Sequence, residues 1–356
     1  MSNNYSIKEL MGLAYQENAS DIHLTIDMPP MLRVNGVLRR YGEALLERDE
    51  LFNMALELMD DRRRAQFLDD GEVDFSYELM HVCRFRVNAF KQSNCTAIAL
   101  RLISEDIPTF EMLGLPKPLE TLAMLPRGLV LVTGPTGSGK STTLAAVINL
   151  INHHRKAHII TLEDPIEYKH QHINCIVNQR EVGSDTKSFA SGLRAALRED
   201  PDVLLIGEMR DPETIATAIT AAETGHLVFA TLHTQDAAST VNRIIDVFPE
   251  HQQQQIRVQL AGNLQGIVAQ QLVVNREQVK RLAAFEILVA TPALRNLIRE
   301  GKTHQILSYI QTGRAEGMVS MDACLAEMVR SNRISIETAH ERCYDLAQFD
   351  RYLHGM

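Results

Sequence analysis

The sequence lacks the features that would indicate a secreted, disulfide-bonded or membrane-spanning protein. It has no tryptophan, and its five cysteines are odd in number and never spaced CxxC. This pattern argues against a disulfide framework and a cysteine zinc site, and it is typical of reduced thiols in a cytoplasm. No apolar run approaches the roughly 18–20 residues that span a bilayer. The N-terminus also lacks the basic and long apolar segments of a secretory signal.

The composition indicates an acidic globular protein of more than one domain. The chain has 356 residues, which suggests two or three domains. Hydrophobic residues make up 45% and charged residues 23%, enough to bury a full core and to exclude wholesale disorder. Asp and Glu number 45 against 36 Lys and Arg, and this balance of −9 disfavours a nucleic-acid coat.

Residues 1–103 show the pattern of a small α+β domain. Helical spacing of apolar residues is followed by alternating apolar and polar runs, and an Asn-Gly pair at 35–36 is a strong hairpin signal. The alternation over 83–89 predicts a strand with Arg84 and Arg86 together on its polar face. A solvated strand face and a ligand-binding face are both consistent with these two arginines.

The rest of the chain differs from residues 1–103 in its proline content and in its pattern of apolar residues. Residues 104–127 contain several prolines, a density that interrupts helices and predicts a linker. Over 128–292, short β-rich runs alternate with helical stretches, which predicts a parallel sheet with helices on both faces. One of these helices should have Asp211 as its N-cap and Pro212 in its first turn. Residues 293–356 are predicted to be helical.

One string of residues indicates nucleotide binding. GPTGSGKS at 134–141 satisfies the pattern GxxxxGK[ST], and a chance match in a chain of this length has a probability on the order of one in a hundred. It follows an apolar run and opens a helical stretch, the setting in which glycine amides wrap phosphates. Lys140 would bridge the terminal phosphates and Ser141 would bind Mg²⁺. We therefore expect a nucleoside triphosphate to bind at Gly134, Pro135, Thr136, Gly137, Ser138, Gly139, Lys140, Ser141 and Thr142.

Two further apolar runs lead into carboxylates. The run at 203–206 precedes Glu208, and an acid at the carboxyl end of a parallel strand points into the ligand crevice. Glu208 is expected to bind Mg²⁺ directly or through water, or to polarise the attacking water. The run at 158–162 leads to Glu163 and Glu167, and hydrolysis needs a carboxylate that orients and deprotonates water. Glu163 is the first choice because it is nearest the strand end, but the pattern does not decide between the two.

A histidine and three arginines complete the candidate site. His233 follows an apolar run, and a neutral imidazole there can sense the γ-phosphate and relay its presence. A purely structural histidine is the alternative. Arg194 and Arg198 lie one helical turn apart, and Arg210 lies further along the chain. These arginines are candidates for offsetting phosphate charge or for reaching a neighbouring subunit, and an ordinary solvent or interface face explains them equally well.

These strings resemble the sequence of a known family. Four of them resemble the Walker A, Asp box, Walker B and His box of secretion-type hexameric ATPases: GPTGSGKSTTLAA (134–146), TLEDPIEY (161–168), LREDPDVLLIGEMRD (197–211) and AETGHLVFATLHT (222–234). Four more are similar to the PilT family of type IV pilus retraction ATPases: ASDIHL (19–24), RFRVNAF (84–90), VNQREVG (177–183) and ALRNLIRE (293–300). The resemblance runs in order across essentially the whole chain.

The resemblance implies an architecture and an activity. The fold would be a PAS-like α+β domain joined by a linker to a RecA-like α/β P-loop ATPase core with a helical C-terminal region. Six copies would form a ring, and ATP with Mg²⁺ would sit between the two domains, approached by Arg84, Arg86 and Arg101. Domain rotation on hydrolysis would turn the inner-membrane pilus platform protein and return pilins to the membrane.

The resemblance also implies a location and partners. The homohexamer would lie at the cytoplasmic face of the inner membrane, peripheral to it through the platform protein. An accessory retraction ATPase would be a further partner, and nucleic acid would not be one. ALRNLIRE differs from the family's usual AIRNLIRE by Leu294, a near volume-conserving change. Leu294, Leu297 and Ile298 would form one helical face and Arg295 and Arg299 another, which predicts an exposed coupling or docking helix.

Several other functions fit the sequence less well. Assembly motors of pili and type II secretion resemble the ATPase core, but they usually carry a long N-terminal extension and a tetracysteine zinc insert. The PilU family of accessory retraction ATPases lacks the complete ALRNLIRE string. A nucleic-acid translocase would need a basic pore and salt-sensitive binding, which the net charge of −9 disfavours. A nearly inactive ATP-binding scaffold would differ from a motor only in its catalytic rate, which the sequence does not reveal.

Overall fold

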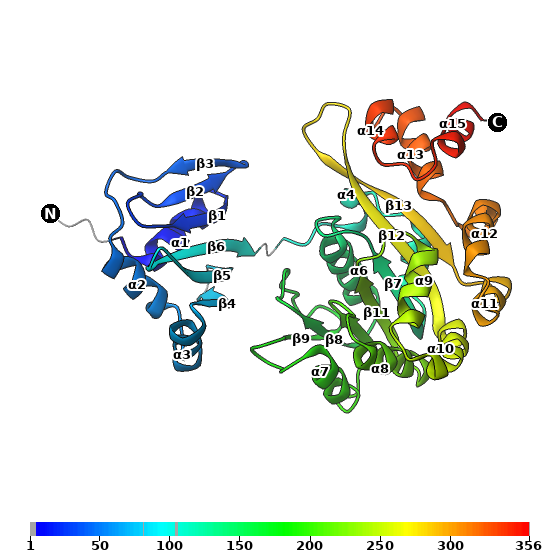
Figure 1. The fold of residues 1–356 in the computed structure, drawn as a ribbon, viewed down its shortest axis with the longest axis horizontal. Coiled ribbons are helices and arrows are strands. Elements are labelled where there is room, and N and C mark those ends of the chain that lie inside the picture. The colour runs from blue at the N-terminus through cyan, green and yellow to red at the C-terminus, as the bar shows by residue number, and fades with distance from the viewer. Residues whose placement is uncertain (1–4, 81, 104–105, 356) are drawn as a thin grey trace. The chain divides into compact units, whose positions relative to one another are not determined.

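The computed structural model describes residues 5–80, 82–103 and 106–355 (Figure 1). The chain divides into two compact units: Met1–Asp106 with Glu167–Lys169, and Ile107–Ile166 with His170–Met356. Each unit has its own sheet and its own buried core. An α+β unit followed by an α/β unit is the fold class that the sequence predicts.

The first unit is built on a six-stranded antiparallel sheet in the order β3-β2-β1-β6-β5-β4. Three helices pack against this sheet. Its elements are α1 (Ile7–Gln16), β1 (Ala19–Leu24), β2 (Met31–Val34), β3 (Val37–Arg40), α2 (Arg48–Glu57), α3 (Asp61–Asp70), β4 (Glu72–Leu79), β5 (Cys83–Gln92) and β6 (Cys95–Ile103).

Local patterns predicted most of this unit. The hairpin at 35–36 is confirmed, because Asn35 and Gly36 both have positive φ, 51° and 81°, between β2 and β3. The alternation in β5 is also confirmed, with Arg84 and Arg86 on the face opposite the buried apolar residues. Helix α3 was not predicted, because its sequence DRRRAQFLDD has no apolar stripe and buries only Phe67.

The second unit is built on a seven-stranded sheet in the order β13-β12-β7-β11-β10-β8-β9. Neighbouring strands are parallel except for the antiparallel pair β12–β13. The elements are β7 (Gly128–Thr133), α6 (Lys140–His154), β8 (His158–Glu163), β9 (Ile176–Glu181), α7 (Phe189–Ala196), β10 (Val203–Ile206), α8 (Pro212–Glu223), β11 (Leu227–Leu232), α9 (Ala237–Asp246), α10 (Glu250–Asn263), β12 (Leu264–Val274) and β13 (Arg281–Val289).

Helices cover both faces of this sheet (Figure 1). Every residue of β7 is buried, and successive residues alternate between two apolar clusters. Leu129 and Leu131 pack with residues of α8, α9 and α10, whereas Val130 and Val132 pack with residues of α6. The predicted parallel sheet with helices on both faces is therefore confirmed, and its central strands are almost wholly apolar because neither face meets water.

The linker predicted over 104–127 is wrong for residues 107–127. This stretch forms α4 (Phe110–Leu113) and α5 (Lys117–Ala123), and Leu119 and Leu122 are buried among residues of α6 and β7. Pro116 is the N-cap of α5 and Pro118 lies in its first turn, where a missing N–H costs nothing. These prolines begin a helix instead of interrupting one. Residues 104–105 lie outside the described part of the chain.

The last part of the second unit is helical. It contains α11 (Pro292–Arg299), the 3₁₀ turn η1 (Thr303–Gln305), α12 (Ile306–Thr312), the 3₁₀ turn η2 (Arg314–Glu316), α13 (Met321–Arg330), α14 (Ile336–His340) and α15 (Leu346–His354). Helix α13 packs on β13, and residues of α13, α14 and α15 share an apolar cluster with the far ends of β12 and β13. Among the described residues, no helix combines the length and the apolar character needed to cross a membrane.

Candidate functional site

The four predicted motifs meet at one edge of the parallel sheet. Strands β7, β11, β10 and β8 are consecutive neighbours, so their carboxyl ends lie side by side. Thr133 pairs with Leu232 in the β7–β11 register, and Ile206 pairs with Leu162 in the β10–β8 register. Gly134 and His233 directly follow β7 and β11, Glu208 lies two residues beyond β10, and Glu163 is the last residue of β8.

The loop between β7 and α6 requires glycine at both of its ends. Gly134 has φ 143°, and a Cβ there would lie 2.2 Å from the carbonyl oxygen of Gln270. Gly139, with φ 88°, is the N-cap of α6 and provides no side-chain cap. The first N–H groups of α6, beginning at Lys140, are therefore left for a ligand, the arrangement that binds phosphate at a helix N-terminus.

Two polar side chains at the phosphate loop, those of Ser138 and Lys140, are buried. Lys140 is 9% exposed, and its Nζ donates to the carbonyl oxygens of Gly134 and Pro135 at 2.8 and 3.1 Å. Burial lowers the pKa of Lys140, and the Glu208 carboxylate opposes this shift. The Oγ of Ser138 is buried with no hydrogen-bond partner. Buried polar groups are normally paired, so the unpartnered hydroxyl of Ser138 and the buried positive charge of Lys140 both fit an anionic ligand.

Gln270 on β12 supports the loop from outside the motif, and the sequence analysis missed it. It is 2% exposed. Its Oε1 accepts from Thr143 Oγ1 at 2.7 Å, and its Nε2 donates to the Ser138 carbonyl oxygen at 2.7 Å. The only signal in the sequence was a pair of glutamines, Gln270 and Gln271, between the apolar runs 267–269 and 272–274 of β12.

The structure brings together three of the predicted residues at the ends of β10 and β11. Glu208 Oε2 lies 2.8 Å from Arg210 Nη2 and 3.4 Å from His233 Nε2. The Glu208 side chain is 17% exposed, whereas that of His233 is 45% exposed. Thr231 Oγ1 donates to the Gly207 carbonyl oxygen, which joins the two strand ends. A change in the charge or position of the Glu208 carboxylate therefore directly affects Arg210 and His233.

Glu163 is held in a defined orientation at the end of β8. Its Oε1 accepts from Thr161 Oγ1 at 2.6 Å and from Gln179 Nε2 at 3.0 Å. A carboxylate has about four acceptor sites, so these two hydrogen bonds alone do not saturate it. Glu163 is the last residue of β8 and lies at the same sheet edge as the phosphate loop, and the choice between Glu163 and Glu167 as the base stays a prediction.

The arginines of α7 have no role in holding the phosphate loop in this structure. Arg194 forms an ion pair with Glu213 at the start of α8. Arg198 follows α7 and is exposed. Both side chains face solvent, which leaves the two predictions for them, phosphate charge and a neighbouring subunit, equally open.

The three candidate arginines of the first unit lie on β5 and β6. Arg86 and Arg101 are opposite each other across these strands. Arg86 faces Asp74 at 3.9 Å, and Arg101 donates to Asp21 at 2.9 Å. Acidic neighbours thus reduce the repulsion between the two guanidinium groups. Arg84 lies on the same face of β5, and a role of these arginines toward nucleotide remains a prediction.

A cavity of ≈ 270 Å³ adjoins the outer side of the phosphate loop. Pro135–Ser138 line one side of it. Its other lining residues are Gln271, Leu272 and Val274 of β12, Arg281 of β13, Thr338 of α14, and Glu341 and Arg342, which follow α14. A lining that combines apolar strand residues with polar and charged side chains suits a ligand with both a flat apolar part and hydroxyl groups.

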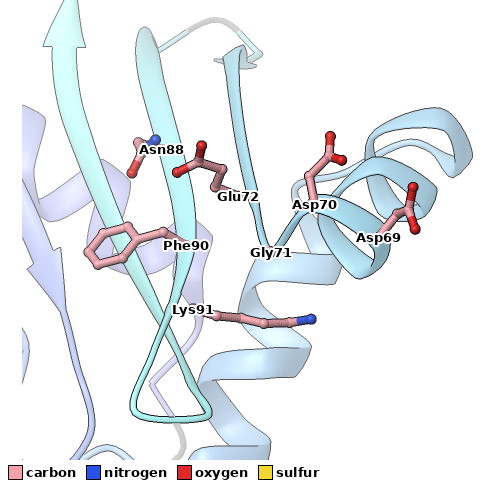
Figure 2. Close-up of a pocket in the computed structure, with 7 residues that line it drawn as sticks. All are labelled: Asp69, Asp70, Gly71, Glu72, Asn88, Phe90 and Lys91. Atoms are coloured by element: carbon pink, nitrogen blue, oxygen red, sulfur yellow. The ribbon is translucent and has the colours of Figure 1, made fainter.

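A larger cavity, ≈ 630 Å³, lies in the first unit between α3, β4 and β5 (Figure 2). Asp69, Asp70 and Glu72 line it, with Lys91 as its only cation among the described residues. Three carboxylates repel a polyphosphate. This cavity is therefore a poor nucleotide site, and none of the sequence motifs falls in it.

The prediction of an exposed docking face on the ALRNLIRE helix is only partly correct. Leu294 and Ile298 of α11 are buried and Arg299 is exposed. Arg295, however, is not part of an exposed docking face. Its guanidinium donates to the carbonyl oxygens of Ala261 and Gly262 at 2.7 and 2.8 Å and to Gln265 Oε1 at 3.0 Å. It caps the end of α10 and holds α11 against it.

Comparison with known proteins places these features in a family. The model of the family described as "Type II/IV secretion system protein" matches residues 3–341. The chain is 48% identical over 336 residues to the "Type IV pilus retractation ATPase PilT" of Pseudomonas aeruginosa, covering 94% of this chain and 97% of that protein. It is 49% identical over 338 residues to a "Twitching motility protein" of Neisseria gonorrhoeae, covering 95% and 90%.

A solved structure gives the same result. The crystal structure of the pilus retraction motor PilT with bound ADP is similar with a TM-score of 0.90 and 46% sequence identity. The match covers 98% of this chain and 99% of that chain. The likeness extends to both the first and the second unit.

Proposed function

The chain belongs to the PilT family of type II/IV secretion system proteins, and we propose that it is the hexameric ATP-hydrolysing motor that powers type IV pilus retraction and twitching motility. The observation that supports this chemistry is that Gly134, Glu208, His233 and Glu163 lie at or just beyond the carboxyl ends of four neighbouring strands. A phosphate loop, an acid for the metal and an acid for water are the parts that phosphoryl transfer to water requires.

The phosphate loop binds the substrate and stabilises the charge that develops on it. Amide groups of Gly134–Thr142 surround the β- and γ-phosphates, and the N-terminus of α6 adds partial positive charge. Lys140 exchanges its two carbonyl partners for phosphate oxygens. Because its side chain is 9% exposed, its charge acts in a region of low dielectric, where it is worth more than in water.

Ser141 and Glu208 are the residues that would hold Mg²⁺. Ser141 lies in the first turn of α6, and Glu208 follows β10. A hydroxyl and a carboxylate, the latter directly or through water, are the oxygen ligands that this cation prefers. Held by these residues, the cation would supply positive charge that offsets the charge of the phosphate oxygens.

Glu163 orients and deprotonates the attacking water. Thr161 and Gln179 fix its carboxylate, so the base is held in place before the reaction. Loss of the γ-phosphate then changes the charge next to Glu208, and His233 and Arg210, which both contact that carboxylate, pass the change on. Arg194, Arg198 and the first-unit arginines Arg84, Arg86 and Arg101 are candidates for contacts with phosphate or with the next subunit of the ring.

The motor needs partners to do work, because hydrolysis alone moves nothing. We place a homohexamer at the cytoplasmic face of the inner membrane, held there by the pilus platform protein that it rotates. An accessory retraction ATPase of the same family is a further partner. A protein of net charge −9 is not expected to act on nucleic acid.

Two experiments test this proposal. ATP hydrolysis should fall by about two orders of magnitude in Lys140→Ala and in Glu208→Gln, while Glu250→Gln, an exposed carboxylate of α10, should match wild type. Equal rates in all four proteins would indicate a scaffold without catalysis. Deletion of the chromosomal gene should leave cells with abundant long pili that no longer shorten. Bald cells would instead show that the protein drives assembly, and unchanged pili would place it in another secretion system.

A further inference from the structure

One hydroxyl group joins the loop after His233 to the strand that supports the phosphate loop. Tyr344 lies between α14 and α15. Its hydroxyl donates to the Gln235 carbonyl oxygen at 2.7 Å and accepts from Gln271 Nε2 at 2.9 Å. Gln235 is two residues beyond His233, and Gln271 is next to Gln270, which hydrogen-bonds the phosphate loop. Burial raises the pKa of Tyr344 above its usual value, so the hydroxyl remains a donor at any working pH.

Tyr344 is fixed to the C-terminal helices through its backbone. Asp322 of α13 accepts from the backbone N–H of Tyr344 at 2.7 Å and from that of Asp345 at 3.2 Å. Asp322 is 7% exposed, and α13 is joined to α15 through a shared apolar cluster. A displacement of the α13–α15 group therefore moves Tyr344, and a displacement of Tyr344 moves that group.

A buried carboxylate makes a second connection between the same elements. Glu286 of β13 is 1% exposed, and its Oε1 accepts from the N–H of Ala237 in the first turn of α9 at 2.8 Å. Helix α9, which follows the His233 loop, is thus joined to β13, the strand against which α13 packs.

The tyrosine segment also faces the nucleotide site. Thr338, Glu341 and Arg342 line the same cavity as Pro135–Ser138. Arg342 is two residues before Tyr344. A nucleotide whose phosphates occupy the loop and whose nucleoside enters this cavity contacts α14, whereas an empty site offers no such contact. Only a contact that differs between two states can shift their populations.

We propose that Tyr344 is a positioning residue for ATP hydrolysis, whose hydroxyl aligns the His233 loop with the phosphate loop and passes nucleotide occupancy to the C-terminal helices α13–α15. The inference rests on the proposed ATPase function and specifies how that site is coupled. Tyr344 acts on His233 and Gln270 indirectly. Its hydroxyl bonds Gln235, which is two residues beyond His233, and Gln271, which is next to Gln270.

The test uses the full-length protein and a pair of matched tyrosine variants. Tyr344→Phe removes only the bridging hydroxyl, and Tyr344 is 41% exposed, so the variant is expected to fold. Tyr352→Phe in α15 is the control, because its hydroxyl has no hydrogen-bond partner in the part of the chain that the structure describes. The measurements are kcat and KM for ATP, and hydrogen exchange of residues 336–355 with and without ADP.

We expect kcat to fall about three- to tenfold in Tyr344→Phe, the range of one lost neutral hydrogen bond, with KM within about twofold of wild type. Protection of 336–355 by ADP should disappear. Tyr352→Phe should behave as wild type. A structural role alone would not abolish the ADP response while leaving KM intact.

Gln271→Met and the double variant complete the test. Both residues act in one chain of hydrogen bonds, so kcat of the double variant should be no lower than that of the worse single variant. Multiplied losses, or a Tyr344→Phe protein with wild-type kcat and ADP protection, would overturn the inference. If Tyr344→Phe does not fold, the same two readouts on Gln271→Met decide. A wild-type protein without ATPase activity would refute the proposed function instead.

Discussion

Replacing Gln270 by methionine should make the phosphate loop less ordered without creating a cavity. Methionine nearly matches glutamine in volume but cannot make the two hydrogen bonds, both 2.7 Å long, to Thr143 Oγ1 and the Ser138 carbonyl oxygen. Gln270 is 2% exposed, so water does not replace the lost partner easily. Each polar group left unpaired in such a place costs about 1–3 kcal/mol. Two such groups are left, so we expect the free energy of unfolding of the second unit to fall by about 2–6 kcal/mol.

The same change should weaken nucleotide binding. The Ser138 carbonyl lies within the loop whose amides surround the phosphates, and a less ordered loop must be ordered on binding. A cost of about 1.4 kcal/mol corresponds to a tenfold rise in Kd, so ADP should bind about tenfold more weakly. Urea denaturation and titration with a fluorescent ADP analogue measure the two effects. Gln255→Met, an exposed α10 position, is the control.

The reasoning would be refuted by a Gln270→Met protein whose free energy of unfolding lies within about 0.5 kcal/mol of wild type and whose Kd for ADP is unchanged. That result would mean that the loop keeps its conformation without support from β12. A loss of stability in Gln255→Met as large as in Gln270→Met would also contradict it, because the effect would then come from methionine itself.

Three further predictions concern stability. Burial raises the pKa of Glu286 to about 7, above its value in the unfolded chain. The folded state therefore binds more protons between about pH 4.5 and pH 7, and the free energy of unfolding should fall by about 3 kcal/mol as pH rises through this window. Glu286→Gln should remove that part of the pH dependence in urea denaturation, and an unchanged slope would contradict the assignment. Arg295→Ala, which breaks three hydrogen bonds at the end of α10, should lower the midpoint of thermal unfolding by an amount equivalent to about 2 kcal/mol, and Arg299→Ala should change it little. Asp211→Ala should cost about 1 kcal/mol because Asp211 accepts from Thr214 N at 2.8 Å; equal stability in circular dichroism melts would show that the cap is dispensable.

Elements with a strong local pattern were predictable. The four central strands of the second unit are almost continuous apolar runs because both faces are covered, and the Asn-Gly turn at 35–36 needs positive φ at both positions. Elements without a pattern were missed. Six of the ten residues of α3 are charged, β9 lies at the sheet edge with four polar residues among its six, and β12 is interrupted by Gly266 and three glutamines. The prolines of 107–127 were misread because proline both breaks a helix and begins one.

The chemical groups of the candidate site are determined by the sequence itself. A triphosphate is bound by consecutive amides and a lysine on one short loop, so eight neighbouring residues suffice to identify it. An acid after an apolar strand is equally local, and Glu163, Glu208 and His233 could be named before any fold was known. Family resemblance extended these local signals to the whole chain.

The partners of those groups were decided only by the tertiary structure. Gln270 reaches Thr143 and Ser138 across more than a hundred residues of chain, and Tyr344 reaches Gln235 across a similar separation. Strand order and register determine which side chains meet, and both depend on the packing of the entire sheet. The capping role of Arg295 also depends on tertiary packing. Residue spacing predicts the faces of α11, but it does not show that the C-terminal end of α10 lies next to Arg295. Local chemistry is therefore set by the sequence, whereas support and coupling are set by the fold.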